Sequence, residues 1–311
     1  MRIIKLNFDS PLHIGEIGIG LEECSSIIHS DTIFNAIVNA YALMHTEDET
    51  DEFLNDFEGV SESVRISSAF PYSADELFFP RPRIKLKAEE GVLFKYNKEL
   101  KRTDFVSKEH FERLINRERF DKEDIEGLVE SRELYKEYQI PKVYLDRETR
   151  KSDFFFISMI EFKEGCGLWF AIECEEAVYS EIKACLRLLQ DEGIGGKRTW
   201  GYGLFTFDED SIGLRLPEKH DLYMLLSLFY PGEGERGLFR GEKSSWDFVV
   251  RGGYTGTVRK PRIRMIKEGS VFEEEPKGEI LKFEDLKSRC YGIAYSIPVR
   301  GLSGQYGSFS S

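Results

Sequence analysis

Two apolar runs joined by a short polar turn constrain the fold of this 311-residue chain more than any other feature. Residues 154–162 (FFFISMIEF) and 167–174 (GLWFAIEC) flank the polar segment 163–166. Apolar runs of this length around a glycine-containing turn predict a β-hairpin. A helical stripe follows directly, so we expect a helix over residues 176–190. Its apolar positions are Val178, Ile182, Cys185, Leu186 and Leu189.

The N-terminal residues predict the elements that would pack with this hairpin. Residues 4–8 alternate apolar and polar side chains, as a half-buried strand does. Ser30 and Asp31 offer helix N-cap chemistry ahead of apolar residues at helical spacing. Residues 64–72 predict another strand, and a short strand follows the glycine-rich loop 193–203. The order strand, helix, strand, hairpin, helix, strand fits an α+β, ferredoxin-like βαββαβ domain.

An insertion and a second domain complete the predicted organisation. We expect the first domain over residues 1–211, with an insertion at about 77–146. The insertion begins with the basic, proline-containing piece LFFPRPRIKLK and continues with a charge-dense part, 107–137, that predicts helix. The pattern restarts after about residue 212, so residues 212–311 predict a smaller, β-rich domain. Its expected strands are 221–230, 246–251, 258–266 and 291–299.

Charge is unevenly distributed along the chain. The net charge of −13 argues against a protein that coats nucleic acid with its whole surface. However, residues 47–62 carry eight acids and no base, and they also predict a surface helix. Residues 251–267 carry six bases and no acid, and residues 81–87 carry four bases. Such local basic stripes are what contact phosphates.

Composition excludes several other classes of protein. No run of apolar residues is long enough for a membrane-spanning helix, and the N-terminus predicts a strand and not a signal peptide. The five cysteines are scattered, which predicts neither disulfides nor a zinc site. We therefore expect an intracellular, cytoplasmic protein that has no metal and no cofactor and does not contact a membrane.

The glycine-rich loop 193–203 is the sharpest local motif. Its five glycines would let backbone N–H groups approach an anion closely, with positive charge and stacking surfaces beside them. It matches neither a Walker A loop nor a dinucleotide-binding fingerprint. The alternative is an ordinary glycine-rich turn. The candidate RNA-binding residues are Gly193, Gly195, Gly196, Lys197, Arg198, Thr199, Trp200, Gly201 and Tyr202.

A second basic motif lies in the predicted second domain. Arg262 and Arg264 alternate along a strand, so both guanidinium groups would follow a phosphate backbone from one face. The alternative is a solvated edge strand that charge protects from aggregation. The candidate RNA-binding residues of this motif are Arg251, Gly252, Gly253, Tyr254, Arg259, Lys260, Arg262 and Arg264.

The start of the insertion combines apolar and basic residues. Phe78 and Phe79 precede Arg81, Arg83 and Lys85. Exposed apolar side chains beside basic residues could wedge between nucleotides. Equally, the two phenylalanines could anchor the insertion to its own core, and the sequence alone does not separate these alternatives.

His13 and His29 raise the question of catalysis. A histidine can act as general base in metal-free RNA cleavage, so a metal-independent endoribonuclease is the alternative function. No paired acid stands at a convincing spacing, and Asp31 is better explained as a helix cap. We expect a protein without catalytic residues.

Four motifs together resemble a known family: PLHIGEIGIGLEE, IIHSDTIFNAI, GIGGKRTWGYG, and RGGY followed by KPRIRMIKEGSVF. They are similar to the RAMP proteins of type III-A CRISPR systems, in particular to the Cas-five-like family of the Csm subunit numbered four. The resemblance spans residues 2 to about 299. It implies two ferredoxin-like (RRM-like) domains, a protruding β-hairpin thumb, and assembly into a crRNA-guided complex for antiviral defence.

The same resemblance implies a binding role. The family's subunit caps the 5′ handle of the crRNA, contacts the large polymerase/cyclase-like subunit and a backbone RAMP subunit, and leaves target cleavage to the backbone. Handle contacts would come from His13 and its loop, Ser30, the loop 193–203 and Arg251–Tyr254. The thumb would be the segment Phe79–Lys87, which includes Arg81, Arg83 and Lys85 and would kink the guide–target RNA duplex.

Overall fold

The computed structural model of the chain describes residues 1–15, 22–58, 64–130, 132–145, 152–255, 258–286 and 288–301. The centre of the glycine-containing motif after His13, the end of the acidic stretch 47–62 and the end of the predicted second domain lie outside the described residues. The α-helices are α1 Ser30–Met44, α2 Glu47–Glu58, α3 Glu90–Lys95, α4 Asn97–Arg102, α5 Lys108–Ile115, α6 Lys122–Val129 and α7 Glu176–Glu192. Short 3-10 helices are η1 Arg198–Trp200, η2 Glu233–Arg240 and η3 Glu284–Leu286.

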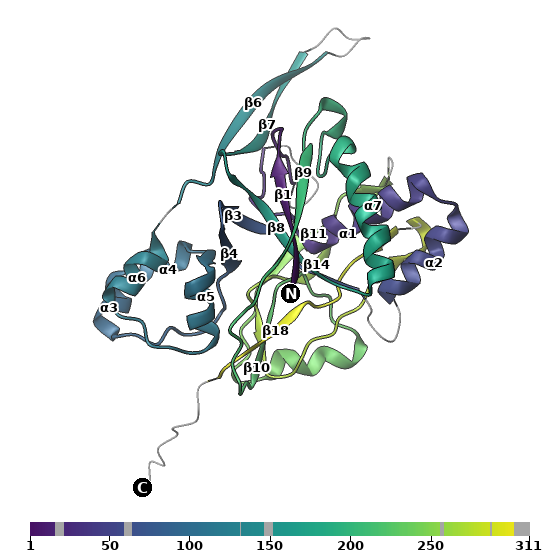
Figure 1. The fold of residues 1–311 in the computed structure, drawn as a ribbon. Coiled ribbons are helices and arrows are strands. Elements are labelled where there is room, and N and C mark those ends of the chain that lie inside the picture. Colours follow the sequence, from purple (N-terminus) through teal and green to yellow (C-terminus); the bar gives the residue numbers. More distant parts are fainter. Residues whose placement is uncertain are drawn as a thin grey trace.

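A seven-stranded antiparallel sheet forms the centre of the molecule (Figure 1). Its strand order is β5-β4-β3-β8-β1-β9, with β2 also paired to β8. Helices α1 and α7 pack against each other on one face of this sheet. The strands are β1 Arg2–Phe8, β2 Arg65–Ile66, β3 Phe70–Ser73, β4 Glu76–Pro80, β5 Phe105–Ser107, β8 Cys166–Glu173 and β9 Phe205–Ser211.

Both faces of this sheet are buried, which explains the unbroken apolar run in β8. Ile4 and Phe170 point into the cluster formed with α1, α2 and α7. Ile3 and Trp169, one position away on the same strands, point into a second cluster on the opposite face. Since successive strand residues alternate faces, a strand covered on both sides has no polar positions to show a period of two.

The C-terminal region covers the second face of the sheet. Leu222, Met224 and Val299 of its small sheet β15-β10-β18 join the cluster around Trp169. The predicted α+β class with antiparallel sheets is confirmed, and the number of ferredoxin-like domains stays a prediction. The strands of this region are β10 Leu222–Leu225, β11 Phe248–Arg251, β12 Tyr254–Thr255, β13 Val258–Arg259, β14 Ile263–Ile266, β15 Val271–Phe272, β16 Leu281–Phe283, β17 Ser288–Cys290 and β18 Ser296–Val299.

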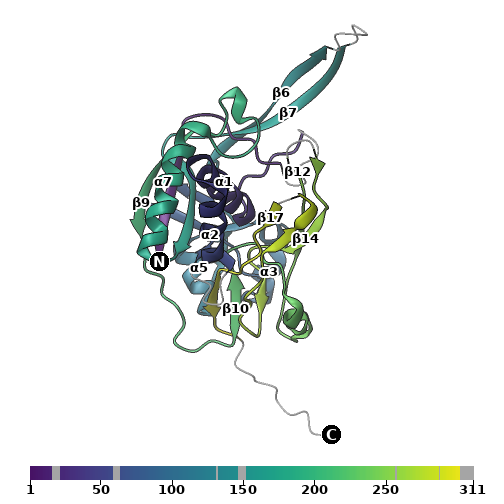
Figure 2. The same cartoon turned by 90° about the vertical axis from the view of Figure 1, so that its right-hand side faces the viewer.

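The predicted hairpin between residues 154–162 and 167–174 is wrong. The first run lies in β7 (Ser152–Phe162), which pairs antiparallel with β6 (Tyr135–Leu145) along its whole length. The second run, β8, pairs with β1 and β3. A run that is apolar on both faces belongs in the centre of a sheet, whereas β7 keeps exposed positions such as Phe154 and extends away from the body (Figures 1 and 2).

The predicted thumb at Phe79–Lys87 is also wrong. Phe79 is 0% exposed in β4, where its ring stacks on Phe111 of the insertion and lies edge-on to Trp169. The backbone N–H of Arg81 donates to Asp104, and Arg83 pairs with Asp247 of the C-terminal region at 2.6 Å. The phenylalanines therefore anchor the insertion, which was the alternative. The element that protrudes is the β6–β7 hairpin.

Candidate nucleic-acid interface

Several glycines of the loop 193–203 serve close packing, either against the chain around His13 or within the loop itself. Gly193 ends α7 with φ of 76°, and Gly203 has φ of 75°, a region that side-chain-bearing residues rarely adopt. A Cβ on Gly203 would lie 2.0 Å from the Ile194 carbonyl oxygen, and one on Gly196 would lie 2.8 Å from the His13 ring. A side chain at Gly196 would therefore push the loop away from His13, and one at Gly203 would collide with the backbone of the loop itself.

Several amides of this loop are already engaged. The N–H of Gly193 donates to Leu189, that of Gly196 to the His13 carbonyl, and that of Gly201 to the Arg198 carbonyl. The predicted anion-binding role of these three amides is wrong, because each donates within the protein. The exposed part of the loop is η1, where Arg198 and Thr199 reach solvent.

Trp200 links this loop to the protruding hairpin. Its side chain is 45% exposed, and the ammonium groups of Lys142 on β6 and Lys197 each lie 5.0 Å from its ring centroid. The ring of Tyr202 approaches Trp200 edge-on at 6.2 Å. These cation–π contacts place positive charge around the partly exposed indole.

Arg251, predicted to bind phosphate, is buried. It is 6% exposed, and its Nε and Nη2 donate to the two carboxylate oxygens of Asp31, each at 2.9 Å. Burial alone would raise the pKa of Asp31, but the Arg251 guanidinium outweighs burial and the pKa is lowered. A guanidinium held in this two-pronged way is not available to an RNA phosphate, so this prediction is wrong for Arg251.

Strand pairing places another arginine of this motif on the opposite face from Arg251. Arg251 faces Ile263, and Val250 faces Arg264. Because neighbouring residues of a strand point to opposite faces, Arg264 lies on the side of the β11–β14 ribbon away from Arg251, where its guanidinium covers the Phe248 ring at 5.0 Å. Arg259, Arg262 and Tyr254 are exposed.

His13, His29 and Ser30 are buried inside the protein. His13 is 4% exposed, and its Nδ1 lies 2.7 Å from the Ser158 carbonyl of β7. His29 is 1% exposed and Ser30 is 0% exposed. Side-chain contacts of His13 and Ser30 with an RNA handle are therefore contradicted. The predicted capping role of Asp31 is also wrong, because α1 has His29 as its N-cap residue and the Asp31 carboxylate pairs with Arg251.

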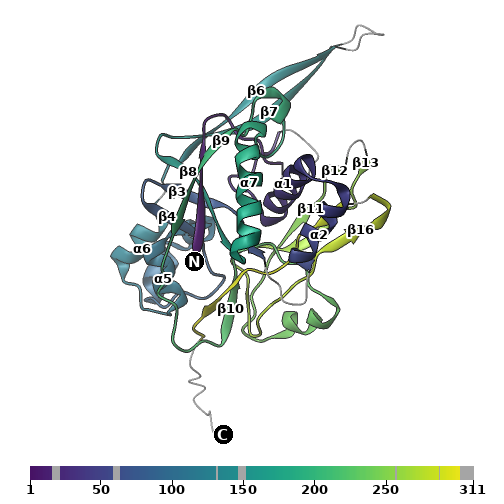
Figure 3. The same ribbon diagram turned by 45° about the vertical axis from the view of Figure 1, so that its right-hand side comes forward.

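A groove runs over the polar face of α1, between the glycine-rich loop and the turn after β11. Its larger part has a volume of about 740 Å³ and its smaller part about 240 Å³. Thr32, Asn35 and Asn39 of α1 line both parts, as does Arg198. Figures 2 and 3 show α1 between α7 on one side and the β12–β13 ribbon on the other.

The groove brings together part of the predicted set. The predicted residues that line it are Gly193, Gly195, Gly196, Arg198, Arg251, Gly252, Gly253, Tyr254 and Lys260. Those outside its lining are His13, Ser30, Lys197, Thr199, Trp200, Gly201, Tyr202, Arg259, Arg262 and Arg264. Burial lowers the pKa of Lys260 at the edge of the groove. Sequence reasoning missed Asn35 and Asn39, although their spacing of four on a helix was a usable signal.

The described residues also bear on metal binding and on membrane insertion. In the ranges given above, no three His, Cys, Asp or Glu side chains gather in a way that could hold a metal ion. No helix in those ranges has the length and apolar character needed to cross a membrane.

Comparison with known proteins defines the class. Residues 5–206 match the model of the RAMP superfamily. The chain therefore belongs to the RAMP superfamily. Residues 218–299 match the CRISPR Csm4 C-terminal domain, and the chain is 31% identical over 286 residues to the CRISPR system Cms protein Csm4 of Thermococcus onnurineus, covering 89% of this chain and 90% of that protein. Within the superfamily it is a member of the Csm4 family, which confirms the predicted resemblance.

Solved structures share the fold. A chain of the Csm1–Csm4 cassette in complex with cA4 matches with a TM-score of 0.68 at 21% identity, covering 97% of this chain and 99% of that chain. A chain of the Csm3–Csm4 subcomplex of the type III-A CRISPR-Cas interference complex also matches with a TM-score of 0.68, at 18% identity, covering 97% and 100%.

Proposed function

We propose that this chain is a non-catalytic, crRNA-binding subunit of a type III-A CRISPR effector complex and that the groove over α1 holds the 5′ handle of the crRNA. The observation that carries the proposal is that two separate segments, each containing glycines and basic residues, line the same groove. Arg198 approaches from the end of α7, and Gly252–Tyr254 with Lys260 approach from the C-terminal region. Membership of the Csm4 family supports an RNA ligand.

The groove offers three kinds of contact to a single strand of RNA. Arg198 and Lys260 supply charge for phosphates, and the amides of Asn35 and Asn39 can donate to or accept from base edges. Tyr254, 56% exposed, offers a ring for stacking, which typically contributes about 1–3 kcal/mol per base. Unpaired bases are read in this way because their edges and faces are accessible.

The proposed protein partners follow from the solved relatives. Since those relatives were solved with Csm1 or with Csm3, we expect this chain to bridge the large polymerase/cyclase-like subunit and a backbone RAMP subunit, in the cytoplasm. The β6–β7 hairpin replaces the segment 79–87 as the proposed thumb. Its exposed Val143, Phe154 and Phe156 are apolar side chains that could wedge beside a guide–target duplex.

The central experiment measures RNA binding by the purified full-length chain. Fluorescence anisotropy would compare guide RNA with and without the 5′ handle over a range of NaCl concentrations. We expect tighter binding of the handle-bearing RNA. The double variant Arg198→Ala, Lys260→Ala should lose affinity and show a shallower salt dependence, by about 0.7 in log–log slope for each phosphate that the protein no longer neutralises.

The matched control removes one exposed arginine and one exposed lysine from the insertion, which lies on the other side of the molecule from α7 (Figure 1): Arg119→Ala, Lys122→Ala. This control should bind as the wild-type chain does. Equal affinities of the groove double variant and the wild-type chain would refute the groove as the handle site. Discrete cleavage products from repeat RNA in EDTA would refute the non-catalytic role.

A further inference from the structure

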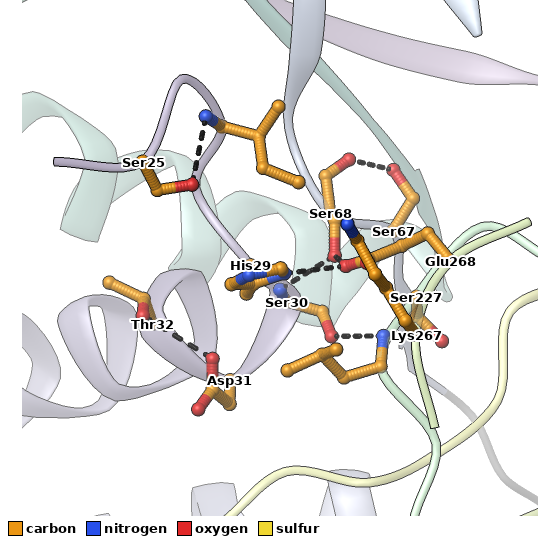
Figure 4. Close-up of polar contacts among 12 residues, drawn as sticks. Ser25, His29, Ser30, Asp31, Thr32, Ser67, Ser68, Ser227, Lys267 and Glu268 are labelled. Carbon is orange, nitrogen blue, oxygen red and sulfur yellow. Dashed lines mark hydrogen bonds and ion pairs between the residues drawn. The ribbon is translucent and has the colours of Figure 1, made fainter. Parts of the chain in front are cut away.

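Three consecutive residues at the start of α1 each bind a different segment of the C-terminal region. The Nδ1 atom of His29 lies 2.8 Å from the Glu268 carboxylate. The Ser30 hydroxyl accepts the backbone N–H of Leu228 at 3.0 Å, and Asp31 pairs with Arg251. Figure 4 shows His29 and Ser30 pointing from the helix start toward the C-terminal segments. We call these three residues the clamp.

The clamp is buried, and a neighbouring serine supports it. Asp31 is 6% and Glu268 is 5% exposed. Ser68 joins the two sides, because its hydroxyl accepts the Ser30 backbone N–H at 2.9 Å and also donates to Glu268. Charged groups in such surroundings persist only when they are paired, so any displacement of one side leaves an uncompensated charge.

The clamp lies directly beside the proposed RNA groove. Asp31 and Arg251 line the groove at the point where Thr32 and Gly252 continue its two walls. One wall, α1, carries the clamp, and Gly252–Tyr254 follow Arg251 immediately on the other wall. Fixing Arg251 against Asp31 therefore fixes the position of the opposite wall relative to α1 and the glycine-rich loop.

We propose that His29, Ser30 and Asp31 are positioning residues that hold the two walls of the RNA groove at a fixed spacing without contacting the RNA. This proposal rests on the proposed function, since it concerns how the same groove is built. It differs sharply from a role for Arg251 in binding phosphate, because the two roles predict opposite effects of removing the Asp31 charge.

Asp31→Asn is the decisive variant. Electrostatics alone predicts tighter RNA binding, because the change removes a negative charge from the groove and releases a guanidinium. The clamp predicts binding weaker by about tenfold, since the wall bearing Tyr254 and Lys260 is no longer held. The salt dependence should also become shallower, because fewer phosphates are neutralised. A mere loss of folded protein would leave that slope unchanged.

The measurement uses the full-length chain and handle-bearing RNA in anisotropy titrations, with hydrogen exchange on the free protein. Asp75→Asn, an exposed residue in the β3–β4 turn, removes the same charge and should leave both readouts at wild-type values. In Asp31→Asn, exchange should rise at residues 249–254 and stay unchanged in β1 and β8. Ser30→Ala keeps every charge and serves if Asp31→Asn does not fold; it should weaken binding by about threefold and raise exchange near Leu228.

The outcomes separate the two proposals. A wild-type chain that fails to bind handle RNA overturns both the groove and the clamp. A wild-type chain that binds, together with an Asp31→Asn chain that binds as tightly or more tightly, overturns the clamp alone. If Asp31→Asn does not fold, a Ser30→Ala chain that matches the wild type in both readouts also overturns the clamp.

Discussion

The glycine-rich loop 193–203 and the ribbon that begins at Phe248 have similar residue compositions, but their arginines have different surroundings. Each combines glycines, cations and an aromatic residue. In the loop, most of the glycines pack closely, against the chain around His13 or within the loop itself, and Arg198 is exposed at the tip. In the ribbon, the first arginine, Arg251, is buried against Asp31 while Arg264 lies on the opposite face.

Local geometry explains the difference. The loop follows the end of α7, where a chain that turns back on itself must expose its outer residues. The ribbon is a pair of strands, and a strand alternates its side chains between two faces whatever their charge. One face of the ribbon covers the start of α1, so the arginine on that face needs a carboxylate partner. Two segments of similar composition therefore differ in role: the loop exposes Arg198 at its tip, whereas the ribbon uses Arg251 in a structural ion pair.

The largest expected effect separates Arg251 from Arg198 by stability. Arg251→Leu should lower the free energy of unfolding by about 3–5 kcal/mol, because the buried Asp31 carboxylate loses its partner. Arg198→Leu, on the exposed tip, should change it by no more than about 0.5 kcal/mol. Urea unfolding of both variants measures this. Adding Asp31→Leu to Arg251→Leu should recover much of the loss, and equal stabilities of the two single variants would contradict the comparison.

A second effect tests what the loop glycines do. Gly203→Ala should cost about 2–4 kcal/mol, since a left-handed backbone and a contact with the Ile194 carbonyl are both imposed. Gly201 has φ of 80° but open space around it, so Gly201→Ala should cost only about 1 kcal/mol. Thermal unfolding in parallel provides the measurement. Similar losses in both variants would mean that packing against neighbouring segments is not what the glycines serve.

RNA affinity gives a third, smaller effect on the loop. Arg198→Ala should weaken binding of handle-bearing RNA by about fivefold to tenfold and reduce the salt slope by about 0.7, the value for one phosphate contact on a single strand. Titrations at several NaCl concentrations measure both quantities. An unchanged slope would show that Arg198 does not contact a phosphate.

The smallest expected effect concerns the far face of the ribbon. Arg264→Gln should leave handle binding within about twofold of wild type, because this guanidinium lies on the ribbon face opposite Arg251 and outside the lining of the groove. The same titration compares it with Arg198→Ala. A loss as large as that of Arg198→Ala would mean that the RNA path includes the face bearing Phe248, and the groove assignment would need to be extended.

Elements with a clear local period were predictable. The helix expected over 176–190 is α7, the helix expected in the acidic stretch is α2, and residues 4–8 lie in β1. The family also followed from local motifs. In contrast, β6 was missed because its charged sequence resembles the helical part of the insertion, and the hairpin partner of β7 was misassigned because turn chemistry indicates a neighbour without fixing which one.

For the interface, the sequence by itself identified the two basic, glycine-containing segments and the kind of ligand that they suit, because glycines, cations and aromatic residues keep their chemistry in any fold. Only the tertiary structure decided which of them face solvent. The partner of Arg251 lies 220 positions away at Asp31, and Phe79 is covered by Trp169 of another strand. Burial and ion pairing depend on contacts between such distant residues, and no local pattern carries that information.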